Sequence, residues 1–103
     1  MAAYAVFFRE GMLDHSELAI YTSKVLESWS NFEAFSPKLL VASGEHDVIE
    51  GGLVEGVVIL EFPNLELARA WYHSPAYQEI LQHRLKGGVF KSIIVSGVAS
   101  SPS

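Results

Sequence analysis

The sequence contains no cysteine, which excludes disulfides, thiolate metal ligands and a cysteine nucleophile. No apolar run approaches the roughly 18 residues that a membrane-spanning helix needs, so we expect no membrane partner. The first residues also lack the basic and apolar stretches of a secretory signal. These absences are compatible with a reducing compartment, and we expect a cytoplasmic protein.

Basic residues are few and scattered, with 7 against 12 acidic residues and a formal net charge of −5. A nucleic-acid-binding surface has to neutralise phosphates, so we expect no nucleic-acid partner. Half of the 103 residues are apolar, which is a large share for so short a chain. Because a small domain has much surface and little interior, burial against a second copy is the simplest use of this excess.

Capping and breaking residues divide the chain into alternating strands and helices. Asp14, followed three residues later by Glu17, has the spacing of a capping box. Asn64 predicts a second helix start, and Ser74-Pro75 predicts a break and a restart. The full pattern predicts strands over residues 3–9, 38–44, 54–62 and 89–98, a turn at residues 10–11, helices over residues 14–32, 64–73 and 75–87, and an extended or bulged arm over residues 44–52.

The resulting order, β-α-β-β-α-β, is typical of the α+β ferredoxin-like fold. In this fold a four-stranded antiparallel sheet carries the helices on one face. We expect one such domain over residues 1–98, followed by a polar C-terminal tail at residues 99–103.

The predicted strands are apolar on both faces. In the third strand Val57 and Ile59 alternate with Val58 and Leu60, where a sheet with one wet face would have polar residues at every second position. The helices can cover only one of these faces. We therefore expect a homodimer in which sheet packs on sheet.

The chain also resembles a known family through residues concentrated between positions 61 and 78. The strongest of these are Glu61-Phe62-Pro63, Ala68, Trp71-Tyr72, Ser74-Pro75 and Tyr77-Gln78, with support from Tyr4, Asp14, Tyr21, Gly44, Glu50-Gly51, Arg84 and Gly97. Over roughly residues 3–98 the chain resembles the family catalogued as domain of unknown function 1330, in the dimeric α+β barrel superfamily.

This resemblance implies a homodimer whose sheets form a barrel, with a pocket between sheet and helices in each subunit. The family has no common reaction. The superfamily includes cofactor-free monooxygenases, haem-handling enzymes, isomerases and polyketide cyclases, so the fold does not choose among them. Ser36-Pro37 and Ala42-Ser43 stand where the family often has a Gly-Gly pair and an arginine. We therefore carry no substrate over from any relative.

Arg84 and Glu61 are the main candidates for chemistry. Arg84 falls at helical spacing with Tyr77, Ile80 and Leu81, so it lies on the apolar face of its helix. A buried arginine needs a partner, and Glu61, at the end of an apolar strand, is the candidate. In one interpretation Arg84 binds a carboxylate or enolate and Glu61 moves a proton. In the other, which we favour, the pair is structural or the arginine head reaches water.

Tyr72 and His73 complete the candidate catalytic residues. Tyr72 and Trp71 have the spacing of core aromatics, although the Tyr72 phenol could donate to a ligand at a pocket mouth. The four histidines show no metal-ligand spacing, so we expect no metal and no cofactor. His73 is the best of them as a base or a haem ligand, although a surface or capping role is the ordinary expectation.

Two classes of function remain open. The first is a cofactor-independent enzyme that performs proton transfer, isomerisation, cyclisation or oxygenation on a small apolar oxygen-bearing molecule. Glu61 or His73 would then act as base, and Arg84 or Tyr72 would stabilise negative charge. The second is a non-catalytic dimer, either structural or binding a small molecule. A roomy cavity lined by Glu61 and Arg84 would count against this class, and a cavity filled by aromatic side chains would favour it. Haem binding is a third and less favoured option.

Overall fold

The computed structural model describes residues 1–98, and the predicted tail at residues 99–103 lies outside the described residues. The elements follow the predicted order, with a 3₁₀ helix added after the first α-helix. They are β1 (Ala3–Met12), α1 (His15–Ser28), η1 (Trp29–Phe35), β2 (Lys38–Ala42), β3 (Gly56–Phe62), α2 (Leu65–His73), α3 (Pro75–Gly87) and β4 (Gly88–Ser96).

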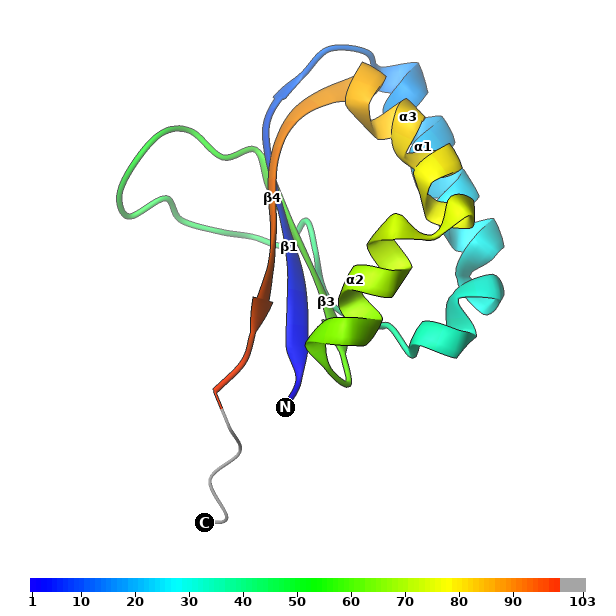
Figure 1. Ribbon diagram of the computed structural model, residues 1–103. Coiled ribbons are helices and arrows are strands. Elements are labelled where there is room, and N and C mark those ends of the chain that lie inside the picture. The colour runs from blue at the N-terminus through cyan, green and yellow to red at the C-terminus, as the bar shows by residue number, and fades with distance from the viewer. Residues whose placement is uncertain (99–103) are drawn as a thin grey trace.

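The four strands form one antiparallel sheet in the order β2-β3-β1-β4, which confirms the predicted ferredoxin-like α+β fold. All of the helices lie on one side of this sheet (Figure 1). Within the part of the chain described, no helix is long and apolar enough to cross a membrane.

The start of α1 lies where its capping residue predicts it. The Asp14 carboxylate accepts hydrogen bonds from the backbone N–H groups of Ser16 (2.9 Å) and Glu17 (3.4 Å). The Ser16 hydroxyl also donates to this carboxylate, and it holds the Asp14 carboxyl pKa below its usual value together with the two backbone bonds. The capping box itself does not close, because the Glu17 carboxylate instead contacts His83 Nδ1 at 2.6 Å. Glu17 therefore links α1 to α3.

The break between α2 and α3 also follows the prediction. The Asn64 side chain accepts from the Leu67 N–H at 2.8 Å, and Ser74 Oγ accepts from the Tyr77 N–H at 3.3 Å. Pro75 occupies the first turn of α3, where its missing N–H costs no intrahelical bond.

Two predicted boundaries are wrong. Residues 10–11 do not turn, because β1 continues to Met12 and stays paired with β4 across a register shift between Arg9 and Gly11. The pairing of this segment with β4 outweighs the turn preference of Glu10 and Gly11. The first α-helix ends at Ser28 rather than near Phe32, and its last part tightens into η1, as often happens at helix ends.

The core lies between the sheet and the helices, with Trp71 of α2 at its centre. Trp71 is 1% exposed, and its ring lies 4.1 Å from that of Tyr77 and 5.3 Å from that of Phe62. Phe7 and Phe32 meet it edge to face. The inner face of the sheet thus packs on an aromatic cluster, not on α1, which contributes no buried residue.

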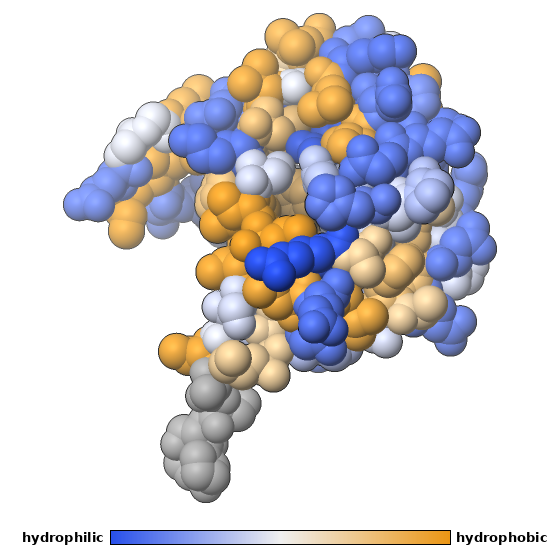
Figure 2. All heavy atoms as spheres, in the orientation of Figure 1, coloured by the Kyte–Doolittle hydropathy of each residue, from blue (hydrophilic) through white to orange (hydrophobic). Residues whose placement is uncertain are grey.

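The opposite face of the sheet, which we call the outer face, has no covering element among residues 1–98. Its apolar side chains gather on the side away from the helices (Figure 2). They include the exposed Val89, Ile93 and Val95 of β4, and the half-buried Tyr4, Val6, Phe8, Val57 and Ile59. The folded sheet therefore has two apolar faces, as its strand sequences predict.

Residues 43–55, between β2 and β3, form an arm that projects from the sheet on the side opposite the helices (Figure 1). The sequence predicted an arm here. His46 closes its base, with Nε2 2.7 Å from the Val54 carbonyl oxygen and Nδ1 3.2 Å from that of Gly44. These two carbonyls raise the His46 pKa.

Candidate functional site

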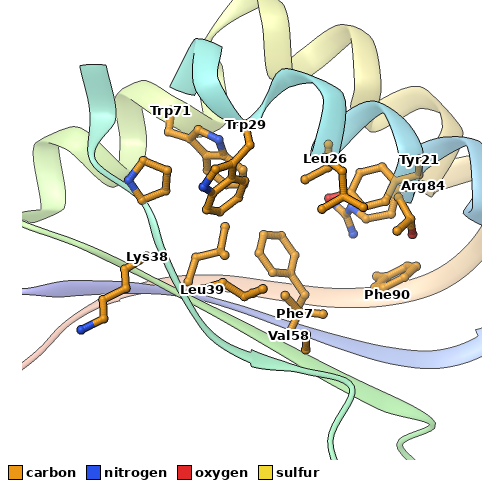
Figure 3. Close-up of a pocket in the computed structure, with 15 residues that line it drawn as sticks. Phe7, Tyr21, Leu26, Trp29, Lys38, Leu39, Val58, Trp71, Arg84 and Phe90 are labelled. Atoms are coloured by element: carbon orange, nitrogen blue, oxygen red, sulfur yellow. The ribbon is translucent and has the colours of Figure 1, made fainter. Parts of the chain in front are cut away.

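A cavity of about 590 Å³ lies between the sheet and the helix layer. Figure 3 shows side chains of α1, η1 and α3 pointing toward side chains of the sheet across it. Phe7, Val58 and Phe90 come from the strands, and Tyr21, Trp29 and Arg84 from the helices. Pockets of roughly 300–1,000 Å³ with mostly apolar walls are typical of small-molecule sites. We call this space the main cavity.

The main cavity exists because α1 docks on α3 and not on the sheet. The backbone N–H groups of Leu13 and Asp14 donate to the Gly87 carbonyl at 2.9 and 3.1 Å. A Cβ atom on Gly87 would lie 2.6 Å from Leu18 Cγ, so the two helices approach closely at this point. With its first turn held on α3, α1 covers the sheet without filling the space beneath it.

Arg84 is the most deeply buried charged residue of the main cavity, with 4% of its surface exposed. Its guanidinium carbon lies 5.2 Å from the centre of the Phe7 ring and 4.8 Å from that of Phe90. Its Nη1 donates to Ser92 Oγ at 3.3 Å, and its Nε has no hydrogen-bond partner. The predicted burial of this arginine is therefore correct.

Two phenols lie beside Arg84. The hydroxyl oxygens of Tyr21 on α1 and Tyr77 on α3 are 2.8 Å apart. Burial raises the pKa of Tyr21 well above its usual range, and the neighbouring Tyr77 adds to this rise while the charge of Arg84 opposes it. Burial also raises the pKa of Tyr77, against an opposing effect of Arg84. Both phenols are therefore neutral donors near neutral pH.

The predicted partnership of Glu61 with Arg84 is wrong. Glu61 pairs in register with Tyr4 and Lys38 and belongs to the outer face of the sheet, whereas Arg84 lies on the inner side. Among residues 1–98 the ion pairs are Arg9–Glu55 and Glu17–His83. The two-residue period of β3 already puts Glu61 on the face of Val57 and Ile59.

Tyr72 and His73 lie together, but not in the main cavity. They line a smaller cavity of about 350 Å³ with Arg69 and Ser92, beside the edge strand β4. The Tyr72 and His73 rings are 5.2 Å apart. The four predicted residues are thus divided among the outer face, the main cavity and this smaller cavity. Phe7 lines both cavities, and the bond from Arg84 to Ser92 connects them.

Four residues that line these cavities are not among the predicted site residues: Tyr21, Trp29, Phe90 and Ser92. Tyr21 and Trp29 recur at helical spacing within the helix predicted over residues 14–32, and such spacing does not separate a cavity wall from a core. Ser92 could be recognised from the sequence as a candidate site residue, because it is a polar residue on the inner face of an apolar strand. Within residues 1–98, no group of three His, Asp or Glu side chains could hold a metal ion.

The sequence pattern described as "Domain of unknown function (DUF1330)" matches residues 2–98, so the chain belongs to this family. The family predicted from the sequence is therefore confirmed. A comparison with curated proteins finds no match.

Solved structures with the same fold include three that cover most of this chain. The RPA0582 protein of unknown function from Rhodopseudomonas palustris is 15% identical, with a TM-score of 0.72 over 96% of this chain and 84% of that one. A dimeric protein of unknown function and ferredoxin-like fold from Bacteroides fragilis is 12% identical, with a TM-score of 0.58 over 93% and 95%. SnoaB, a cofactor-independent oxygenase from Streptomyces nogalater, is 12% identical, with a TM-score of 0.58 over 99% and 97%. These likenesses concern the fold.

Proposed function

We propose that this member of the DUF1330 family binds a small, largely apolar, oxygen-bearing molecule in the main cavity and acts on it without a cofactor. The observation that carries the proposal is the cavity itself, about 590 Å³ of mostly apolar space with one buried guanidinium in its wall. A cavity of this size accommodates a bicyclic or tricyclic molecule. The SnoaB fold hosts cofactor-independent chemistry in that protein, which is compatible with the proposal.

The chemistry that fits the lining is stabilisation of an enolate or phenolate. When a proton leaves carbon next to a carbonyl group, negative charge develops on the carbonyl oxygen, and a preorganised cation there lowers the barrier. Arg84 would supply this cation. The lining contains no Asp, Glu or His, so the proton would pass to water or to a buffer base entering the cavity. Of the four residues predicted as catalytic, Arg84 is the one this proposal retains.

Deuterium exchange into β-tetralone, an apolar bicyclic ketone that enolises, tests this proposal. The α-carbon gives its proton to solvent base, the enolate oxygen is held by Arg84, and deuterium returns from D₂O. We expect the protein to accelerate exchange, measured by NMR, and Arg84→Met to reduce this acceleration about a hundredfold. Val58→Phe, which fills the cavity floor, should reduce it too, while Val48→Phe in the arm should not. Exchange at the buffer rate in the presence of bound ketone would refute the catalytic role.

A non-catalytic binding protein is the second candidate, and a specific observation favours it. The lining contains no Asp, Glu or His side chain that could act as a general base. In that case β-tetralone would quench the fluorescence of Trp29 and Trp71, which line the cavity, without exchanging faster than in buffer.

We also propose that two copies of the chain pair through their outer faces. The exposed apolar residues of β4 support this, as does the dimeric state of the B. fragilis protein with the same fold.

Ile93→Lys is expected to convert the dimer to a monomer, because Ile93 is 49% exposed on the outer face and a lysine there would be desolvated in the interface. Leu85→Lys is the matched control, since Leu85 is 61% exposed on α3. Light scattering after gel filtration measures both, and a dimeric Ile93→Lys protein would contradict the proposed interface.

A further inference from the structure

The charge of Arg84 is not balanced by any side chain around it. Neither ion pair within residues 1–98 includes Arg84, and the lining of the main cavity contains no carboxylate. An arginine guanidinium is always charged in a protein. The faces of the Phe7 and Phe90 rings offset part of its desolvation, and Ser92 takes one of its five donors. Arg84 therefore brings a net positive charge into the wall of the cavity, and its Nε is a buried donor without a partner.

The tyrosine pair adds a second donor. Two neutral phenols carry two O–H groups, and the bond between Tyr21 and Tyr77 uses only one of them. Among residues 1–98, neither hydroxyl makes a second hydrogen bond that would use the other O–H. Tyr21 lines the cavity, so the pair can turn this hydroxyl toward a ligand. Arg84 and the phenols together present donors and no anionic acceptor.

We infer that Arg84 and the Tyr21–Tyr77 pair bind the ionised oxygen of the ligand, so that the main cavity selects conjugated ring compounds in their phenolate, enolate or carboxylate form. This inference rests on the proposed function and names the class of molecule that the cavity takes. A fixed buried cation stabilises the anion of a weak oxygen acid and lowers the pKa of the bound acid. The apolar walls recognise the ring, and the neutral phenols donate to the oxygen without competing for the negative charge. The other charged residue of the lining is Lys38, whose ammonium points away from the cavity (Figure 3).

The test uses para-nitrophenol, a phenol that ionises near neutral pH and whose phenolate absorbs visible light. At a pH where the free probe is mostly protonated, adding the protein is expected to produce the phenolate band. The pKa of the bound probe should fall by at least about one unit, a tenfold preference for the anion. Para-nitroanisole, which cannot ionise, should bind at least about tenfold more weakly for the same reason.

Matched variants assign the effect to the proposed residues. Arg84→Met keeps the length of the side chain and removes its charge, so the phenolate band should disappear while para-nitroanisole still binds. Tyr77→Phe should weaken phenolate binding by a smaller factor, which keeps the test informative if Arg84→Met folds poorly. Lys86→Met, which removes an exposed positive charge two residues further along α3, should leave the band unchanged.

The outcomes separate this inference from the proposed function. If both probes bind the wild-type protein equally and no phenolate band appears, the cavity binds small molecules but does not select an anion, and the inference is wrong. The same holds if the band survives in Arg84→Met. If neither probe quenches Trp29 and Trp71 fluorescence, the proposed function fails, and the inference fails with it.

Discussion

Replacing Trp71 by alanine is expected to lower the free energy of unfolding by about 3–5 kcal/mol, the usual loss when a large buried aromatic side chain is removed. Trp71 is 1% exposed, and its ring packs against Phe62 and Tyr77 at centroid distances of 5.3 and 4.1 Å. It also joins the sheet to η1, because Phe7 and Phe32 meet its faces edge-on. Because Trp71 contacts the sheet, η1 and α3 at once, small shifts of its neighbours cannot fill the space that its removal leaves.

Urea unfolding followed by circular dichroism, at one fixed protein concentration, measures this loss. Trp29→Ala is the control, because Trp29 is only half-buried at the cavity wall and should cost clearly less. A loss below about 1 kcal/mol for Trp71→Ala would be typical of a surface position, and it would contradict the packing described here. Since a domain of this size is stable by roughly 5–15 kcal/mol, the expected loss is a large share of the total.

The sequence predicts the fold well where the signal is local. Asp14, Asn64 and Ser74 begin the helices as predicted, because a capping side chain acts on backbone groups two or three residues away. The apolar alternation of β1 and β3 correctly predicts a sheet with two apolar faces. The turn at residues 10–11 is the exception, since its pairing with β4 depends on residues far along the chain.

The candidate site is harder to predict because it depends on contacts between distant segments. Arg84 was correctly placed on an apolar helix face, but its ring partners Phe7 and Phe90 lie on two different strands. Tyr21 and Tyr77 are 56 positions apart, and no local pattern indicates that their hydroxyls meet. Glu61 is the instructive error. The two-residue period of β3 puts Glu61 on the outer face, opposite Tyr4, so its charge does not bring it to Arg84.

The volume of the main cavity could not be predicted at all, because it follows from how α1 is held. A helix with Tyr21, Val25 and Trp29 on one face is expected to press that face into a core. Here the first turn of α1 is fixed on α3 at Gly87, and the apolar face lines a cavity instead. The missing side chain of one glycine therefore has a direct effect on the site.

Gly87→Val is accordingly expected to lower the free energy of unfolding by about 1–3 kcal/mol, the usual cost of overpacking, and to weaken ligand binding in the main cavity. A Cβ atom at position 87 would lie 2.6 Å from Leu18 Cγ and 2.9 Å from the Leu18 backbone nitrogen. Both distances are too short, so α1 has to move away from α3. Removing glycine from a helix end favours the helix by roughly 0.5–1 kcal/mol, which is smaller than the steric cost.

A double-mutant cycle with Leu18→Ala separates the two parts of this clash. Leu18→Ala removes the side-chain atoms that the new Cβ meets, but it leaves the backbone nitrogen 2.9 Å away, so the double variant should recover only part of the stability. Gly52→Val is the control, since no atom lies within 4 Å of a Cβ atom there. If Gly87→Val and Gly52→Val cost the same, close docking of α1 on α3 does not hold the cavity open. If Gly87→Val loses binding of para-nitrophenol and para-nitroanisole alike, the position of α1 controls entry to the cavity independently of the charge of Arg84.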